Sequence, residues 1–140
     1  MKQQKGLKRC ASRYPNKILK LSLPMPPSIN HMYINTKNGG KKLTKKAERY
    51  IRDARALANL AIEEQLWIKE NAPVWYYLDI YFYMPDRRIR DSHNTIKILM
   101  DALQGSIYIN DYYCMPRIQD VDYDPANPRI EIICRAKREK

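Results

Sequence analysis

Glycine, histidine and cysteine are scarce in this chain of 140 residues, and their scarcity excludes several kinds of site. The four glycines, at positions 6, 39, 40 and 105, are too few and wrongly spaced for a phosphate-binding glycine loop or a serine-nucleophile elbow. The two histidines, His31 and His93, are too far apart for a zinc-protease motif. Cys10, Cys114 and Cys134 form no CxxC pair, which predicts reduced, buried thiols and no structural zinc.

Long apolar runs are also missing. The longest, Val74–Met84, is far shorter than the roughly 20 residues of a membrane-spanning helix, and Asp79 interrupts it. The N-terminus is basic, but no apolar run follows that would complete a signal peptide. We therefore expect no membrane partner and a cytoplasmic protein.

Acidic residues are the minority among the charged ones. Lys and Arg number 26 against 15 Asp and Glu, which gives a formal net charge of +11. Such an excess attracts polyanions, and nucleic acid is the first candidate partner. The excess is greatest between residues 37 and 55, where a solvated helix face would normally mix the two signs. We interpret four lysines of this stretch as phosphate-binding residues: Lys41, Lys42, Lys45 and Lys46.

Hydrophobic periodicity predicts a single α+β domain over residues 17–135, with one mixed β-sheet packed with two main helices. Residues 1–16 carry no acid and little apolar content, which predicts a basic, flexible N-terminal tail, either free in solvent or lying along phosphates. Residues 136–140 form a charged C-terminal tail. We expect strands over 17–23, 74–84, 117–123 and 129–135, a hairpin turn at Asn38-Gly39, and helices over 45–66 and 92–104.

The same patterns predict which faces are buried. Thr44 is the expected N-cap of the first helix, and Gly105 ends the second. The expected buried residues of the first helix are Ala47, Tyr50, Ile51, Ala54, Leu57, Ala58 and Ala61, and those of the second are Ile96, Leu99, Met100 and Leu103. Alternation along 74–84 gathers Trp75, Tyr77, Tyr81 and Tyr83 on one sheet face. Such a face can stack nucleobases, but packing under a helix is commoner and is what we expect.

Residues with the chemistry of a metal-dependent phosphodiesterase lie between residues 84 and 111. They are Asp91, His93, Lys97 and Asp111, with Arg87, Arg88 and Arg90 close by in sequence. Acids of this kind bind a divalent ion, and cations stabilise the charge that develops on phosphate. Alternatively, Asp91 is a helix N-cap and Lys97 pairs with Asp101 on an exposed helix face. Spacing alone leaves both interpretations open.

Two stretches resemble the signatures of the RusA-type Holliday junction resolvases. Residues 23–33, LPMPPSINHMY, are similar to an opening LPxPPSxN followed by tyrosine. Residues 86–97, DRRIRDSHNTIK, are similar to a helix start of the form D-x-D-N-x-x-K. The DALQG of residues 101–105 and the pair Asn110-Asp111 match two later elements in the same order. The resemblance covers about residues 17–135 and implies a RusA-like fold.

The resemblance implies a small homodimeric endodeoxyribonuclease that depends on Mg²⁺ or Mn²⁺ and acts in DNA recombination and repair. It would cut a four-way (Holliday) junction, or other branched DNA, by paired symmetric nicks. It would be encoded by a phage or prophage and work in the cytoplasm of a bacterial host. Two alternatives remain: a catalytically impaired protein that binds junctions or single-stranded DNA, and an unrelated RNA-binding module.

The resemblance also assigns roles to individual residues. Asp91 and Asp111 match the family's metal-binding aspartates, and Lys97 matches the lysine that assists at the scissile phosphate. His93 stands where the commonest pattern has a second aspartate, and Asn110 replaces the first acid of an aspartate pair. Because imidazole also binds divalent metals, we expect His93 to be a third ligand.

Overall fold

The computed structural model describes residues 18–27, 33–68, 74–87 and 95–137. In chain order the elements are β1 (Ile18–Leu23), β2 (Tyr33–Asn35), β3 (Lys41–Leu43), α2 (Lys45–Glu64), β4 (Tyr76–Met84), α3 (Ile96–Leu103), the 3₁₀ turn η3 (Asp111–Tyr113), β5 (Cys114–Tyr123) and β6 (Arg129–Ala136). Residues 1–17 and 138–140, which include most of both predicted tails, lie outside the described residues.

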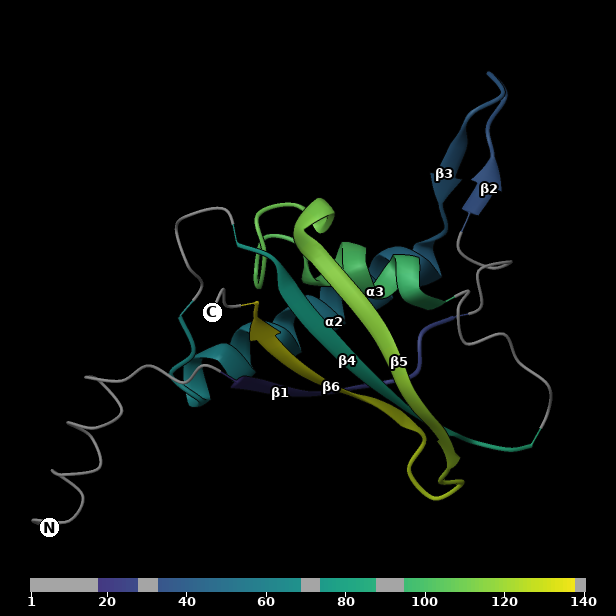
Figure 1. Ribbon diagram of the computed structural model, residues 1–140. Helices are drawn as coiled ribbons and strands as arrows, with labels where there is room; N and C mark the ends of the chain where they lie inside the picture. Colours follow the sequence, from purple (N-terminus) through teal and green to yellow (C-terminus); the bar gives the residue numbers. More distant parts are fainter. Residues whose placement is uncertain (1–17, 28–32, 69–73, 88–94, 138–140) are drawn as a thin grey trace, which may run out of the picture.

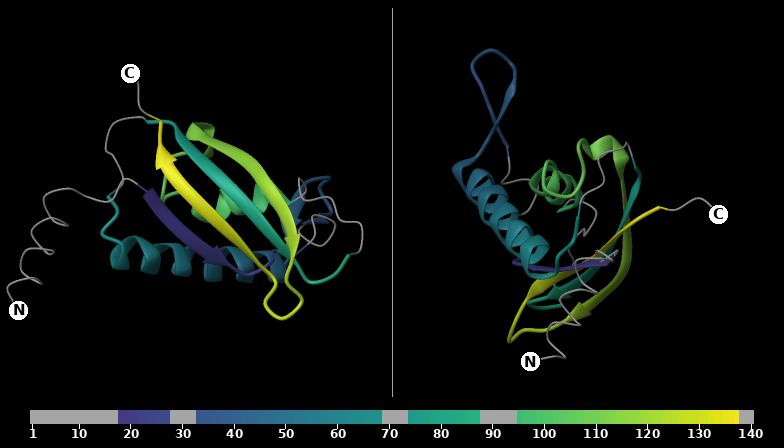
Figure 2. Two further views of the ribbon diagram at one scale, coloured as in Figure 1. Left: turned by 60° about the horizontal axis from the view of Figure 1, so that its bottom comes forward. Right: turned by 90° about the vertical axis from the view of Figure 1, so that its left-hand side faces the viewer.

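A four-stranded sheet forms the centre of the domain, with strand order β1-β6-β4-β5. β4 and β5 run parallel, whereas β6 is antiparallel to both β1 and β4, so the sheet is mixed. β2 and β3 form a separate hairpin. Both helices cover one face of the sheet (Figures 1 and 2), which confirms the predicted α+β fold.

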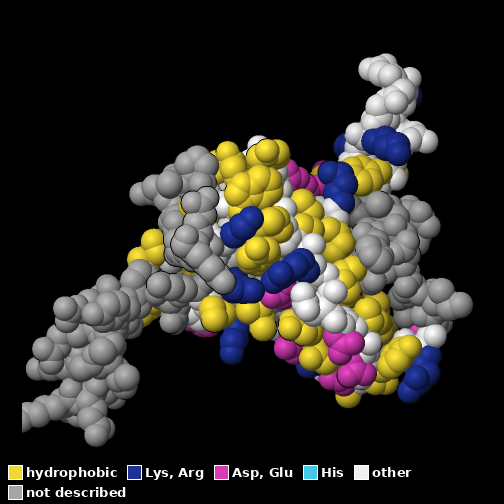
Figure 3. All heavy atoms as spheres, viewed as in Figure 1, with side chains coloured by type: hydrophobic (Ala, Val, Ile, Leu, Met, Phe, Trp, Pro, Cys, Tyr) yellow, Lys and Arg dark blue, Asp and Glu magenta, His cyan; other side chains and the backbone are white. Residues whose placement is uncertain are grey.

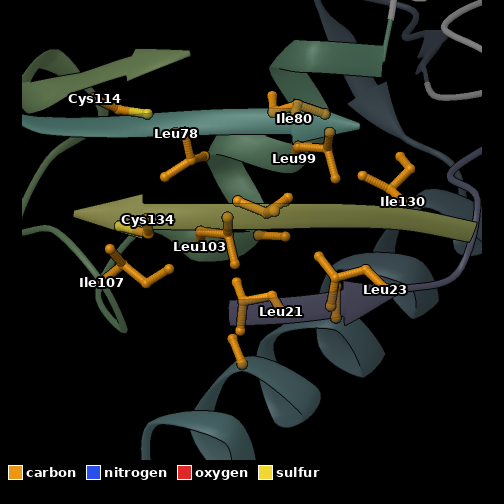
Figure 4. Packing of buried hydrophobic residues seen from close by; sticks show 14 of the residues in the cluster. Leu21, Leu23, Leu78, Ile80, Leu99, Leu103, Ile107, Cys114, Ile130 and Cys134 are labelled. Carbon is orange, nitrogen blue, oxygen red and sulfur yellow. The ribbon is translucent and has the colours of Figure 1, made fainter. Parts of the chain in front are cut away.

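The core lies between the sheet and the helices, and strand alternation builds it. Every second side chain of β1 and β4 is buried, as their sequence patterns predict. Leu78 and Ile80 of β4 point toward Leu99 and Leu103 of α3, with Leu21 of β1 beside them (Figure 4). β5 begins at residue 114, three residues before the predicted start at 117.

The proline-rich segment that follows β1, residues 24–27, packs against α2. The Tyr50 hydroxyl donates to the Pro24 carbonyl oxygen at 2.7 Å, so the proline-rich segment after β1 is held on the helix. At the other end of α2, the Gln65 side chain bonds both backbone groups of Lys20 at 2.9 and 2.7 Å. These bonds pair backbone groups of β1, which is an edge strand.

Two details of α2 differ from the prediction. The helix ends at Glu64, and Leu66 beyond it has a positive φ of 54°, which does not continue a helix. Leu57 is 40% exposed, so its placement on the buried face is wrong. The buried residues of α2 are Tyr50 and three alanines, Ala47, Ala54 and Ala58. The small alanine side chains let the helix lie close to the sheet.

The buried stripe of α3 also differs. Ile98 and Ala102 are fully buried together with Leu99 and Leu103, whereas Ile96 and Met100 are half-buried. α3 packs against α2 as well as against the sheet, so it buries a wider face than a helix resting on one surface.

Three tyrosines of β4, Tyr77, Tyr81 and Tyr83, face away from both helices, so the expectation that this face packs under a helix is wrong. Arginines from neighbouring strands cover two of these rings. The Arg117 guanidinium lies 4.1 Å from the centre of the Tyr77 ring, and that of Arg129 lies 4.0 Å from the Tyr83 ring. This side of the sheet, opposite the helices, is called the open face below; among the described residues no helix lies on it.

Within the described ranges, no helix is long and apolar enough to cross a bilayer.

Candidate functional site

The predicted hairpin forms around a tight turn between β2 and β3. The Thr36 N–H donates to the Gly40 carbonyl oxygen at 2.9 Å, and Gly39 has a φ of +80°, a conformation that glycine adopts without strain. The hairpin projects well beyond the sheet and helices (Figure 1). It can therefore reach a large ligand while the body of the domain stays to one side.

Four exposed lysines follow this turn within one short stretch. Lys41 and Lys42 lie on β3, and Lys45 and Lys46 begin α2. Thr44 connects the two elements: its hydroxyl accepts a hydrogen bond from the Ala47 N–H at 3.2 Å, which confirms the predicted N-cap. The cap fixes where the helix starts, so two lysines at the end of the hairpin are followed at once by two at the start of the helix; these four exposed lysines are called the basic surface below.

Some cations of α2 have internal partners. Arg55 Nε donates to the Ala102 carbonyl oxygen at 3.1 Å, and its Nη2 donates to that of Asp101 at 2.9 Å. A guanidinium at these carbonyls satisfies the C-terminal end of α3 and complements its dipole. Arg55 thus joins the two helices, whereas the four lysines are exposed.

Lys97 lies in the first turn of α3 and is exposed. Its Nζ is 3.7 Å from the Asp101 carboxylate, with the two side chains 60% and 30% exposed. The ion pair predicted as an alternative is therefore present, and at this exposure it contributes only a few tenths of a kcal/mol, roughly. A pair this weak leaves the lysine able to exchange its partner for a phosphate.

Asp111 is half-buried at the first position of η3. Its backbone N–H donates to Gln104 Oε1 at 3.1 Å, and Gln104 is the residue that ends α3. Asn110 precedes it and caps the turn, since its Oδ1 accepts from the Tyr112 N–H at 2.9 Å. Asp111 therefore lies beside the end of α3 opposite to Lys97.

Buried groups lie behind Asp111. The Tyr108 hydroxyl donates to the Met100 carbonyl oxygen at 2.6 Å. Burial raises the pKa of the Cys114 thiol to about 12, and the nearby Asp111 charge adds to the rise. Burial also raises the pKa of Cys134. Both thiols are free and buried, as predicted, and stay protonated at neutral pH; Cys10 lies outside the described residues.

An aromatic cluster beside Asp111 was not predicted as a unit. It consists of Trp75, Tyr112 and Tyr113, whose ring centres lie 5.0, 5.1 and 5.7 Å apart in the three pairs. Tyr112 is 66% exposed and Trp75 37%. The available signal was the pair of tyrosines directly after Asn110-Asp111, but only the fold brings Trp75 to them.

Several predicted site residues lie outside the described residues: Arg88, Arg90, Asp91 and His93. Arg87 is described; it is exposed, with its guanidinium 4.4 Å from the centre of the Tyr123 ring. In the part of the chain that the structure describes, no three His, Cys, Asp or Glu residues gather into a metal-binding group. Of the predicted metal ligands, the structure thus places Asp111.

A family comparison decides the class of protein. The family model for endodeoxyribonuclease RusA matches residues 24–135, from the end of β1 to the last residues of β6. The chain belongs to the RusA endodeoxyribonuclease family. No curated protein matches the sequence significantly. Within this RusA-family chain the matched range includes the four lysines, Lys97 and Asp111, so the predicted site falls inside the nuclease domain of the family.

Proposed function

We propose that this RusA-family endodeoxyribonuclease resolves Holliday junctions and other branched DNA by paired symmetric nicks, in DNA recombination and repair. The observation that carries the proposal is the family match over residues 24–135, which includes both signature stretches almost completely. A four-way junction has two-fold symmetry, so two equivalent cuts suit a homodimer with one site in each subunit. The enzyme acts in the bacterial cytoplasm and is encoded by a phage or prophage.

Asp91, His93 and Asp111 are the proposed ligands of a divalent ion, Mg²⁺ or Mn²⁺. When bound, such an ion polarises the scissile phosphate and lowers the pKa of the attacking water. Asp111 fits this role, since its half-buried carboxylate takes no hydrogen bond or ion pair from another described residue. A carboxylate in that position is a hard oxygen donor, as Mg²⁺ requires.

The length of the chain is compatible with a site that includes both aspartates. α3 has eight residues and so spans about 12 Å. Four peptide steps lead from Asp91 to Thr95, and they reach at most about 14 Å when extended. Asp91 can therefore lie near Asp111 although the two precede and follow the helix.

Cations supply the remaining parts of the proposed site. Lys97 stabilises charge at the scissile phosphate, after exchanging Asp101 for the DNA. The basic surface of hairpin and helix binds the phosphates of a DNA arm through Lys41, Lys42, Lys45 and Lys46. Arg87, Arg88 and Arg90 bind phosphates closer to the cut. In this arrangement the basic surface provides most of the affinity for DNA, and the residues around α3 cleave the phosphodiester bond.

A direct test uses a synthetic four-way junction with each strand labelled in turn, incubated with Mg²⁺ or Mn²⁺. We expect nicks at symmetric positions in two opposed strands and no cutting of a duplex of the same sequence. Asp91→Asn and Asp111→Asn each remove one ligand and should abolish nicking while junction binding is retained. Asp53→Asn removes an exposed acid on α2 and should cut like the wild type.

Two other outcomes would identify a different function. Junction binding without nicking in any divalent ion indicates a catalytically impaired binding protein, an alternative that His93 and Asn110 favour because each replaces an acid. Equal binding of branched DNA, duplex and RNA would contradict a junction-specific protein altogether.

A further inference from the structure

The exposed aromatic cluster of Trp75, Tyr112 and Tyr113 has no role in the core. Its rings contact one another, and Tyr112 and Trp75 also present a large part of their surface to solvent. Tyr112 is the residue directly after Asp111, so the cluster adjoins the proposed site of phosphate cleavage. We propose that this cluster is a stacking platform for unpaired nucleobases at the branch point of the DNA. The proposal rests on the proposed function for its substrate.

Planar side chains extend the cluster onto the open face. Burial alternates along residues 75–77, which puts Tyr77 on the same side as Trp75. The Tyr77 ring lies under two guanidinium groups, 4.1 Å from Arg117 and 5.2 Å from Arg135. Asp79 fixes Arg117 in this position by two hydrogen bonds of 2.7 and 3.1 Å. Rings and guanidinium planes together offer the flat surfaces on which successive bases stack.

The charges on the open face favour binding of a polyanion at the end of the sheet that carries Trp75. Arg135 and Lys137 are exposed, and the Lys137 N–H donates to the Trp75 carbonyl oxygen at 2.7 Å, so this end of the sheet carries cations beside the rings. Asp111, the proposed metal ligand, is next to the rings in the chain, whereas three further acids lie at the other end, at the last residues of β5 and in the turn that follows: Asp120, Asp122 and Asp124. Figure 3 shows hydrophobic side chains with Lys and Arg beside them over the upper part of this face, and the largest group of Asp and Glu side chains toward its lower right.

The same observations argue against a second copy of this chain as the occupant. In a symmetric interface centred on this cluster, Arg135 and Lys137 of one copy would lie near the same residues of the other, and these like charges repel. A stable protein interface buries about 800 Å² on each partner, whereas this platform consists of three rings. A few unpaired bases with their phosphates fit the area and the charge.

The two tryptophans make the proposal measurable. Trp67 is 5% exposed and Trp75 37%, so Trp67→Phe leaves Trp75 as the sole tryptophan, which can be excited at wavelengths that tyrosine does not absorb. We expect a 15-nucleotide oligothymidine, without metal, to quench this fluorescence, and a duplex of equal length to quench it much less. If Trp67→Phe does not fold, iodide quenching of the wild type reports Trp75, because the buried Trp67 is shielded.

Two tyrosine variants separate stacking from a general loss of structure. Tyr112→Ala removes the most exposed ring and should weaken oligothymidine binding by about 5- to 100-fold. Tyr81→Ala is the matched control, since Tyr81 lies on the same open face but pairs in register with Asp120 and Glu131. Its affinity for oligothymidine should equal that of the wild type.

The proposal is overturned if oligothymidine leaves Trp75 fluorescence unchanged, or if Tyr112→Ala and Tyr81→Ala bind it equally. It is also overturned if Tyr112→Ala converts a dimer into a monomer in sedimentation, since the cluster would then be a subunit interface. These measurements need no cleavage. A protein that cuts junctions without quenching refutes the platform alone, and one that quenches but never cuts refutes the proposed nuclease function alone.

Discussion

The backbone N–H of Asp111 donates a 3.1 Å hydrogen bond to Oε1 of Gln104. Because Gln104 is the residue that ends α3, the bond ties the candidate metal ligand to a helix whose other face is fully buried. The position of the carboxylate therefore depends on a residue that carries no charge.

Replacing this glutamine tests the dependence. Gln104→Ala removes the acceptor, and the loss of one hydrogen bond of about 1 kcal/mol corresponds to roughly a five-fold effect. We expect the metal concentration for half-maximal cleavage to rise by about that factor, with junction affinity in the absence of metal unchanged. Gln104→Glu retains an acceptor oxygen and should restore most of the activity. Wild-type metal dependence in Gln104→Ala would show that the bond does not position Asp111.

The basic surface should control the salt dependence of DNA binding. Changing Lys41, Lys42, Lys45 and Lys46 together to alanine removes up to four phosphate contacts, and each contact contributes about 0.9 to the slope of log affinity against log salt. We expect weaker binding to all sequences and a slope reduced by about two to four. The quadruple arginine variant keeps the charge and should keep the slope. An unchanged slope in the alanine variant would place the DNA elsewhere.

His93 should set the metal preference. Imidazole is a softer ligand than carboxylate and suits Mn²⁺ better than Mg²⁺. We expect a larger ratio of Mn²⁺- to Mg²⁺-supported cleavage than in His93→Asp, which should cleave well with Mg²⁺. His93→Ala should impair cleavage with both ions. Wild-type rates in His93→Ala with either ion would show that His93 is not a ligand.

Buried thiols should make the fold sensitive to alkaline pH. Burial raises the pKa of Cys114 to about 12 and raises that of Cys134, whereas an unfolded cysteine ionises near pH 8.5, roughly. Their contribution to stability is complete below about pH 8.5 and is lost as the pH rises, because only the unfolded chain then releases these protons. Each thiol should lower the free energy of unfolding by about 1.4 kcal/mol per pH unit above pH 9.

Urea unfolding at pH 8, 9 and 10 under reducing conditions measures this slope. Cys114→Ala is less stable at every pH because it loses buried volume, but between pH 8 and 9 its slope should be about half that of the wild type; nearer pH 10 the buried Tyr50 and Tyr108, whose pKa values burial also raises, add to the slope of both proteins. Parallel slopes for the two proteins would mean that the Cys114 pKa is not raised by the fold.

The sequence by itself determined the local structure and the family. Alternation placed every second residue of β1 and β4 in the core, since a strand turns successive side chains to opposite faces. Thr44 and the Asn38-Gly39 turn marked the helix start and the hairpin through their own backbone chemistry. The signature stretches predicted the RusA family, which the family match over residues 24–135 confirmed.

Tertiary structure decided which faces are covered and which residues from distant segments meet. Periodicity identified the two faces of β4, but it did not show that both helices pack on the same face. The face that carries Tyr77, Tyr81 and Tyr83 was therefore wrongly predicted to lie under a helix. Leu57 and Ile98 were misplaced for the same reason, because burial on a helix depends on what packs against it. The cluster of Trp75 with Tyr112 brings together residues 37 positions apart, which no local pattern encodes. Only the packing of β4 beside β5 creates that contact.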